Sequence, residues 1–167
     1  MYARKKYQEI QELLKMTFEA EKKYYEAAEE VQIVALSRFL NHQSVERNKY
    51  ANELVEGLTF NEIKPDISYI KKGKIHQKGL DFKLTLENTK YIPIVCKCLD
   101  HDQDLIDKCA IVLEDDTIPI DILEIITRLM THLIFQGIEG SYIMEELNRK
   151  KAQVQKAKVV QLKNEYL

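Results

Sequence analysis

The chain of 167 residues contains only 5 glycines and 3 prolines. Folds built from many short strands need frequent turns, and glycine and proline are among the residues that most often form them. This scarcity therefore argues against a many-stranded fold. The length is that of a single domain and is sufficient to bury a hydrophobic core.

The sequence also lacks a large excess of either charge, because 25 basic residues stand against 27 acidic ones and the net charge is -2. This balance gives no electrostatic reason to expect nucleic acid or an anionic membrane as the main partner. No stretch approaches the roughly 18 uncharged apolar residues that a membrane-spanning helix requires. We therefore expect neither nucleic-acid binding nor membrane association.

Cysteine is scarce as well, since Cys96, Cys98 and Cys109 are the only three. Residues 1–10 are charged and contain no apolar segment of the kind found in secretory signal peptides. An odd number of cysteines without a signal peptide indicates reduced thiols. The expected location is the cytoplasm, and no Cys/His spacing matches a zinc site.

Helical periodicity is the strongest positive signal. Apolar residues recur at alternating spacings of three and four, which is typical of the seam of a helical bundle. The periodic segments run approximately over residues 4–31, 34–58, 90–116 and 117–147. Short links join the first two segments and the last two, and such links predict antiparallel helical hairpins.

The connection between the two predicted hairpins, residues 59–90, is much longer. A helix of 25 residues is about 37 Å long, and a connection of this length can span it. The sequence therefore predicts an all-α, ferritin-like antiparallel four-helix bundle over residues 1–147, with a long crossover between helices two and three. Residues 148–167 form a Lys-rich segment that we expect to be a helical tail.

Four polar residues interrupt the apolar seams: Glu21, Glu46, Asp102 and His132. Each lies near the middle of its predicted helix, and the middles of all helices in a four-helix bundle share one layer. Burial of a lone carboxylate costs several kcal/mol unless it is paired, protonated or bound to metal. One explanation is a site for iron, manganese or zinc, which accept oxygen and imidazole ligands.

A hydrogen-bonded network without metal is the other explanation. In that network His132 is protonated beside Glu21 or Asp102, and Tyr24, Tyr50 and Gln43 complete the hydrogen bonds. Gln43 and Gln136 lie one helical turn from the predicted layer. The two explanations make opposite demands on His132, because a metal ligand must be neutral.

The ferritin-like di-metal pattern requires two Glu-x-x-His segments, and neither is present. Lys49 follows Glu46 at the position of the histidine, and Leu129 precedes His132 at the position of the glutamate. We therefore do not expect a complete di-iron oxidase site. The sequence also has no Gly-rich phosphate loop and no nucleophile elbow, so no catalytic or cofactor-binding residue is assigned.

Several local sequences occur in an order that matches a known family. Residues 19–24 read EAEKKY, residues 26–29 read EAAE, and the second predicted helix contains ANEL at 51–54. The predicted crossover contains Gly73, His76 and Lys83. In order and spacing these features resemble an uncharacterised bacterial family of ferritin-like four-helix-bundle proteins.

The resemblance covers residues 8–147 and has clear departures. Gln77 stands where the family usually has arginine, and Gly79 stands where it often has tryptophan. The resemblance implies the ferritin-like fold. It implies no activity, because the family has none established and a fold alone does not define a function.

The sequence thus predicts a helical bundle of unknown biochemical role, with binding or assembly favoured over catalysis. The alternative is a metal-binding protein with a degenerate carboxylate and histidine site formed by Glu21, Glu46, Asp102 and His132. Expected partners are further copies of the chain, held through helix faces or the Lys-rich tail. A partner helix docked on that tail is the remaining alternative.

Overall fold

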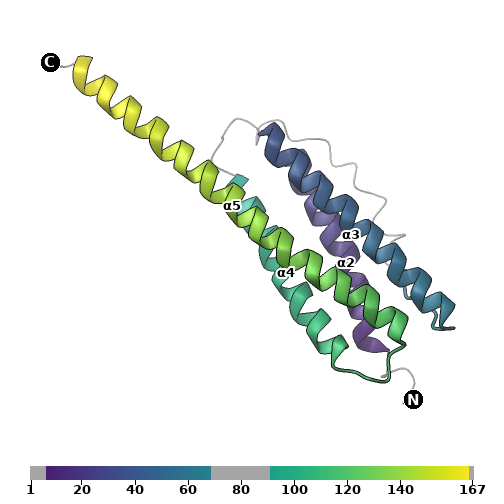
Figure 1. The fold of residues 1–167 in the computed structure, drawn as a ribbon. Coiled ribbons are helices and arrows are strands. Elements are labelled where there is room, and N and C mark those ends of the chain that lie inside the picture. Colours follow the sequence, from purple (N-terminus) through teal and green to yellow (C-terminus); the bar gives the residue numbers. More distant parts are fainter. Residues whose placement is uncertain (1–6, 69–90, 166–167) are drawn as a thin grey trace.

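The computed structural model describes residues 7–68 and 91–165. Within these ranges it contains four helices and no strands, with bounds α2 (Gln8–Glu30), α3 (Val34–Phe60), α4 (Tyr91–Leu113) and α5 (Ile120–Glu165) (Figure 1). The prediction of an all-α fold with four helices is confirmed for this part of the chain. Most of the predicted crossover, with Gly73, His76 and Lys83, lies outside the described residues.

Each helix packs against two others, in the order α2, α3, α5 and α4 around the bundle. Neighbouring helices run in opposite directions. Lys108, near the end of α4, forms ion pairs with Glu9 and Glu12 at the start of α2. Arg128, near the start of α5, pairs with Glu53 near the end of α3. Figure 1 shows the same arrangement, in which α2 and α5 run one way while α3 and α4 run the other.

Hydrogen bonds at its C-terminus end α3 and hold the start of α5 beside it. Glu62 adopts a positive φ of 59°, and the N–H of Ile63 donates to the carbonyl of Leu58 at 2.9 Å. A left-handed residue followed by such a backward hydrogen bond is a common way to end a helix. The Asn61 amide then donates to the Asp121 carboxylate at 2.8 Å, which joins the end of α3 to the first turn of α5.

The buried apolar residues form two clusters that occupy opposite halves of the bundle. One cluster combines the first half of α2 with the ends of α3 and α4 and the start of α5, and it includes Leu14, Leu54, Leu105 and Ile126. The other combines the end of α2 with the starts of α3 and α4 and the middle of α5, and it includes Leu36, Val95 and Met144. The end of α3 and the start of α4 therefore lie at opposite ends of the bundle.

Polar residues fill the space between the two clusters. On α3 the segment between the clusters buries Gln43, Ser44 and Arg47, and on α4 it buries His101 and Asp102. A polar layer at mid-bundle was expected from the sequence. Its membership differs from the expectation because the buried face of α3 includes Arg47, whereas Glu46 is only half-buried.

The helix α5 continues far beyond the other three helices (Figure 1). Leu147 still packs against the second apolar cluster, and every residue from 152 to 165 is exposed. The predicted division of the chain after residue 147 therefore falls inside one continuous helix. No helix in the described ranges is long and apolar enough to span a membrane.

Candidate functional site

The centre of the polar layer is the fully buried side chain of Arg47 on α3. Its Nε donates to Oδ1 of Asp102 on α4 at 3.1 Å, and its Nη2 donates to Oδ2 of the same carboxylate at 2.5 Å. Its Nη1 donates to the carbonyl and to the side-chain oxygen of Gln43, both at 2.9 Å. Two-point pairing of this kind holds a guanidinium and a carboxylate in one fixed geometry.

Tyr24 on α2 completes the surroundings of Asp102. Its hydroxyl donates to Oδ2 of Asp102 at 2.5 Å, and the guanidinium carbon of Arg47 lies 3.9 Å from the centre of its ring. Burial is the main cause that raises the pKa of Tyr24. The hydroxyl therefore stays protonated and serves Asp102 as a hydrogen-bond donor.

The layer connects all four helices. The Gln43 amide donates to Oε1 of Gln136 on α5 at 2.6 Å, which extends the hydrogen-bonded chain from α2 through α4 and α3 to α5. We call Tyr24, Gln43, Arg47, Asp102 and Gln136 the core polar cluster. Asp102 compensates the charge of Arg47 inside the bundle. The hydrogen bonds between cluster members on different helices also set the position of each helix along the bundle axis.

The family comparison covers the first three helices of this bundle. The model of the family described as a domain of unknown function (DUF2383) matches residues 5–115. The chain belongs to this DUF2383 family. The prediction of an uncharacterised family is confirmed. No curated protein and no solved structure matches the chain.

The region matched by the DUF2383 model contains four members of the core polar cluster, and Gln136 lies beyond it. Arg47, which is central to the cluster, was not singled out in the sequence. Its spacing in the sequence could have predicted its burial, because Arg47 lies four residues from both Gln43 and Ala51 and residues at this spacing share one face of α3. Arg47 was passed over because it is charged, and arginine is rarely buried unless it is paired.

The four predicted metal ligands do not form one group in this DUF2383 protein. Asp102 is buried, but both of its carboxylate oxygens accept hydrogen bonds from Arg47 or Tyr24. Glu21 and Glu46 are half-buried. The described residues include no group of three or more His, Cys, Asp or Glu side chains that could hold a metal ion.

His132 on α5 lies beside the core polar cluster. The hydrogen-bonded network predicted without metal required a protonated His132, and the structure favours the neutral form. Burial and the nearby charge of Arg47 lower its pKa, although Glu46 and Asp102 act in the opposite direction. Its ring centre lies 5.5 Å from that of Tyr50, and its Nε2 has no hydrogen-bond partner among the described residues. The neutral imidazole is therefore the favoured form.

A second histidine, His101, lines a groove of about 450 Å³ between α2 and α4. The groove is lined by both acidic and basic side chains, among them Lys23, Glu26, Lys97 and Asp104. The Nε2 of His101 lies 4.0 Å from a carboxylate oxygen of Glu19. Burial is again the main cause that lowers the pKa of His101, and Lys23 adds to the effect.

The two histidines predict how stability depends on pH. A folded-state pKa below the ordinary value of 6.5 means that the unfolded chain takes up protons more readily. The free energy of unfolding should therefore be highest above pH 6.5 and should decrease as the pH falls toward 5. Urea titrations from pH 8 to pH 5 measure this loss.

Substitution separates the histidines from other titrating groups. His132→Gln and His101→Gln should each reduce the loss of stability between pH 7 and pH 5. His42→Gln, at an exposed residue of α3, serves as the matched control for His101→Gln. His132→Gln is compared with the wild type, because the charge of His42 helps to lower the pKa of His132. If neither His101→Gln nor His132→Gln reduces the loss, burial of neutral histidines does not contribute to the pH dependence.

Proposed function

We propose that the chain is a ferritin-like four-helix bundle that acts in binding or assembly, with its long helix α5 as the contact element. The ferritin-like arrangement consists of two helical hairpins joined by a long crossover. The antiparallel neighbours fit this arrangement. The positions of the end of α3 and the start of α4 at opposite ends of the bundle also fit it.

The main observation behind a role in binding or assembly is that the core polar cluster fills the middle of the bundle. In ferritin-like metal proteins, carboxylates from facing helices converge at this level and bind cations. Here the guanidinium of Arg47 contacts both oxygens of Asp102. A positive charge at that position repels a cation and supplies the hydrogen bonds that a buried carboxylate needs. The cluster thus provides a structural connection between helices.

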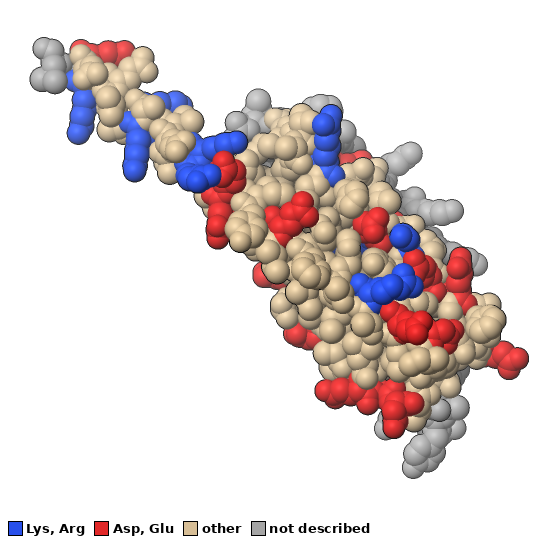
Figure 2. Space-filling view, in the orientation of Figure 1, with Lys and Arg blue, Asp and Glu red and all other residues tan. Residues whose placement is uncertain are grey.

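The surface of α5 supports a role in contacts with other molecules. Phe135, Ile138 and Tyr142 are 65%, 52% and 68% exposed, and they project from the side of α5 opposite to its buried residues. Contiguous exposed apolar side chains on a soluble domain commonly mark interaction sites. Figure 2 shows the uncharged surface along the bundle and the basic side chains gathered on the projecting end of α5.

Site-specific photo-crosslinking in the cells that contain the protein tests this role. A photoreactive phenylalanine analogue at Phe135 should give a reproducible crosslinked species, either with a second copy or with another protein. The matched control position is Val45 on α3, which is 58% exposed. Equal crosslinking from both positions, or none from Phe135, would contradict the assignment of α5 as the contact element.

The competing alternative is binding of iron, manganese or zinc by Glu21, Glu46, Asp102 and His132, and metal-dependent unfolding measurements distinguish it from the present proposal. The cytoplasmic location predicted from the sequence is kept as a proposal. The three cysteines are free, and burial raises the pKa of Cys98 and Cys109 to about 12, so these two thiols are unreactive near neutral pH.

A further inference from the structure

The exposed side of α5 contains a second seam that no other helix covers in the part of the chain that the structure describes. It consists of residues at alternating spacings of three and four, and all of them are exposed. They are Phe135, Ile138, Tyr142, Glu145, Arg149, Ala152, Lys156 and Val159. This is the spacing of a coiled-coil seam, in which one helix presents a continuous stripe to another. We call it the outer seam.

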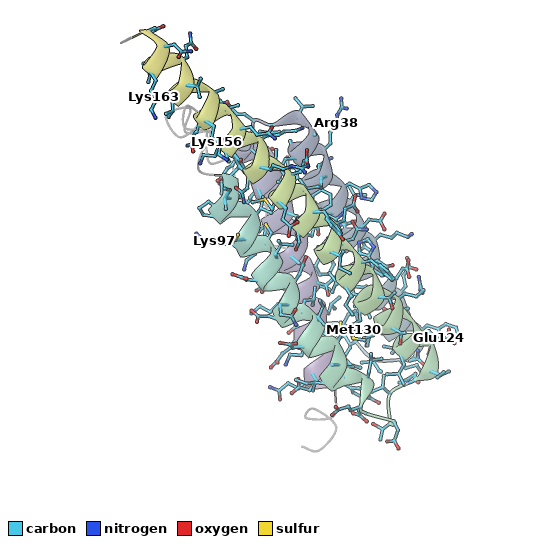
Figure 3. The ribbon with its side chains drawn as sticks, turned by 60° about the vertical axis from the view of Figure 1, so that its left-hand side comes forward. Arg38, Lys97, Glu124, Met130, Lys156 and Lys163 are labelled. Atoms are coloured by element: carbon cyan, nitrogen blue, oxygen red, sulfur yellow. The ribbon has the colours of Figure 1, made fainter. Side chains whose placement is uncertain are left out.

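The outer seam begins on the bundle and continues onto the projecting part of α5. Figure 3 shows Lys156 and Lys163 on this projecting part, beyond the ends of the other helices. An isolated helix is only marginally stable in water, and most helices in proteins are held by packing of one face. A projecting helix with a stripe of this kind therefore has the form of one half of a helix pair.

We propose that the chain forms a homodimer in which the outer seams of two copies pair in antiparallel orientation, an inference that rests on the proposed role of α5. In one register every outer-seam residue meets another. Phe135 then lies opposite Val159, Ile138 opposite Lys156, Tyr142 opposite Ala152, and Glu145 opposite Arg149. Each pair occurs twice because the two helices are related by a twofold axis near residue 147.

The residue pairs are complementary in size and charge. Large apolar residues on the bundle meet small or aliphatic ones on the tail, and the stem of Lys156 can cover Ile138 while its charge stays in water. Glu145 meets Arg149 of the other copy, and opposite charges across a helix pair favour one orientation. Within one chain Arg149 pairs with Glu146, an exposed contact that contributes little.

Charge distribution favours this antiparallel arrangement over a parallel one. The tail contains one acidic residue, Glu165, and six basic ones: Arg149, Lys150, Lys151, Lys156, Lys158 and Lys163. In a parallel pair the two basic tails would lie side by side and repel each other. Figure 2 shows the basic side chains on the projecting end of α5. In the antiparallel pair each tail would lie along the bundle segment of its partner, and the two basic segments would point in opposite directions.

The oligomeric state of the full-length protein tests the pairing first. Light scattering coupled to size-exclusion chromatography should give a dimer for the wild type. The double variant Phe135→Glu/Ile138→Glu should dissociate at least about 100-fold more readily, since loss of large apolar anchors commonly has effects of this size and each pair occurs twice in the dimer. Val45→Glu, an equally exposed apolar position on α3, should remain dimeric. Circular dichroism confirms that each variant is helical.

Disulfide crosslinking tests the register and the orientation. The exposed Cys96 is first changed to serine in all chains. A mixture of Tyr142→Cys and Ala152→Cys chains should form a disulfide-linked heterodimer on mild oxidation. Tyr142→Cys mixed with Val154→Cys, which lies off the outer seam, should not. Efficient linkage of Tyr142→Cys to itself would indicate parallel pairing and would overturn the proposal.

The experiments distinguish an error in the proposed homodimer from an error in the proposed contact role of α5. A wild-type chain that stays monomeric at high concentration overturns self-pairing. If Phe135 still crosslinks to another protein in cells, the contact role of α5 stands with a different partner. If the chain is dimeric but Phe135→Glu/Ile138→Glu dimerises as well as the wild type, the dimer uses another surface and the outer seam is ruled out.

Discussion

Replacement of Arg47 by methionine should lower the free energy of unfolding by about 3–5 kcal/mol, the usual cost of removing one partner from a buried ion pair. Arg47 is fully buried and donates to both oxygens of Asp102. Methionine has a similar length but no charge, so the carboxylate of Asp102 would be left buried with only Tyr24 as a donor. Urea unfolding with an unchanged m-value measures the loss.

An exposed ion pair provides the control for Arg47→Met. Arg128 pairs with Glu53 at 2.6 Å, and the Arg128 side chain is 54% exposed. Arg128→Met should cost at most about 1 kcal/mol, because solvent screens such pairs. A cost for Arg47→Met as small as that for Arg128→Met would show that the buried pair does not connect α3 to α4 in the way described.

Replacement of Tyr24 by phenylalanine should lower the free energy of unfolding by about 2 kcal/mol, in the range measured for hydrogen bonds to charged groups. The change keeps the ring under Arg47 and removes only the hydroxyl that donates to Asp102. Tyr25→Phe, at a tyrosine that is 50% exposed and lies away from the outer seam, should have almost no effect on stability. Thermal or urea unfolding of the two variants gives the comparison directly.

A double-mutant cycle tests whether the core polar cluster acts as one unit. Tyr24 and Arg47 share Asp102 as their acceptor, so the losses from Tyr24→Phe and Arg47→Met should not add. Coupling of roughly 0.5–3 kcal/mol is expected for residues in one network. Strict additivity would mean that the two residues stabilise Asp102 independently.

The helical architecture was predictable because it depends on periodic patterns that extend over many residues. The periodicity of α4 placed Val95, Cys98, Asp102 and Cys109 on one face, and all four are buried. The level of the polar layer was predictable for the same reason. Residues near the middle of four helices of similar length must lie at similar heights in a bundle.

The members of the cluster were harder to predict because the buried face of a helix is wider than a strict seam. The sequence pattern selected Glu46 and His132, whereas the structure buries their neighbours Arg47 and Leu133. A change of one residue rotates the buried face by about 100°. For charged residues the correct choice depends on a partner on another helix, and Asp102 lies far from Arg47 in the sequence.

The outer seam could be recognised only once the structure showed which face of α5 is buried. The tail alone reads as Lys-rich and weakly amphipathic. Once Leu129, Leu133 and Met144 define the side that faces the bundle, Phe135, Ile138 and Tyr142 are seen to lie on the opposite side. Two apolar stripes on one helix indicate two contact surfaces, and the bundle uses only one of them.

The stability of metal-free protein with and without added metal tests most directly whether the core polar cluster takes the place of a metal site. Chelator-treated wild-type protein is melted alone, with excess Mn(II), and with Fe(II) under anaerobic conditions. If the core polar cluster takes the place of a metal site, the Tm is the same in all three samples. A metal present at 100 times its Kd would stabilise the fold by about 2.7 kcal/mol and raise Tm by roughly 5–10 °C. Such a rise, if it disappeared in Glu21→Leu or Glu46→Gln, would contradict the account and establish the carboxylates as ligands.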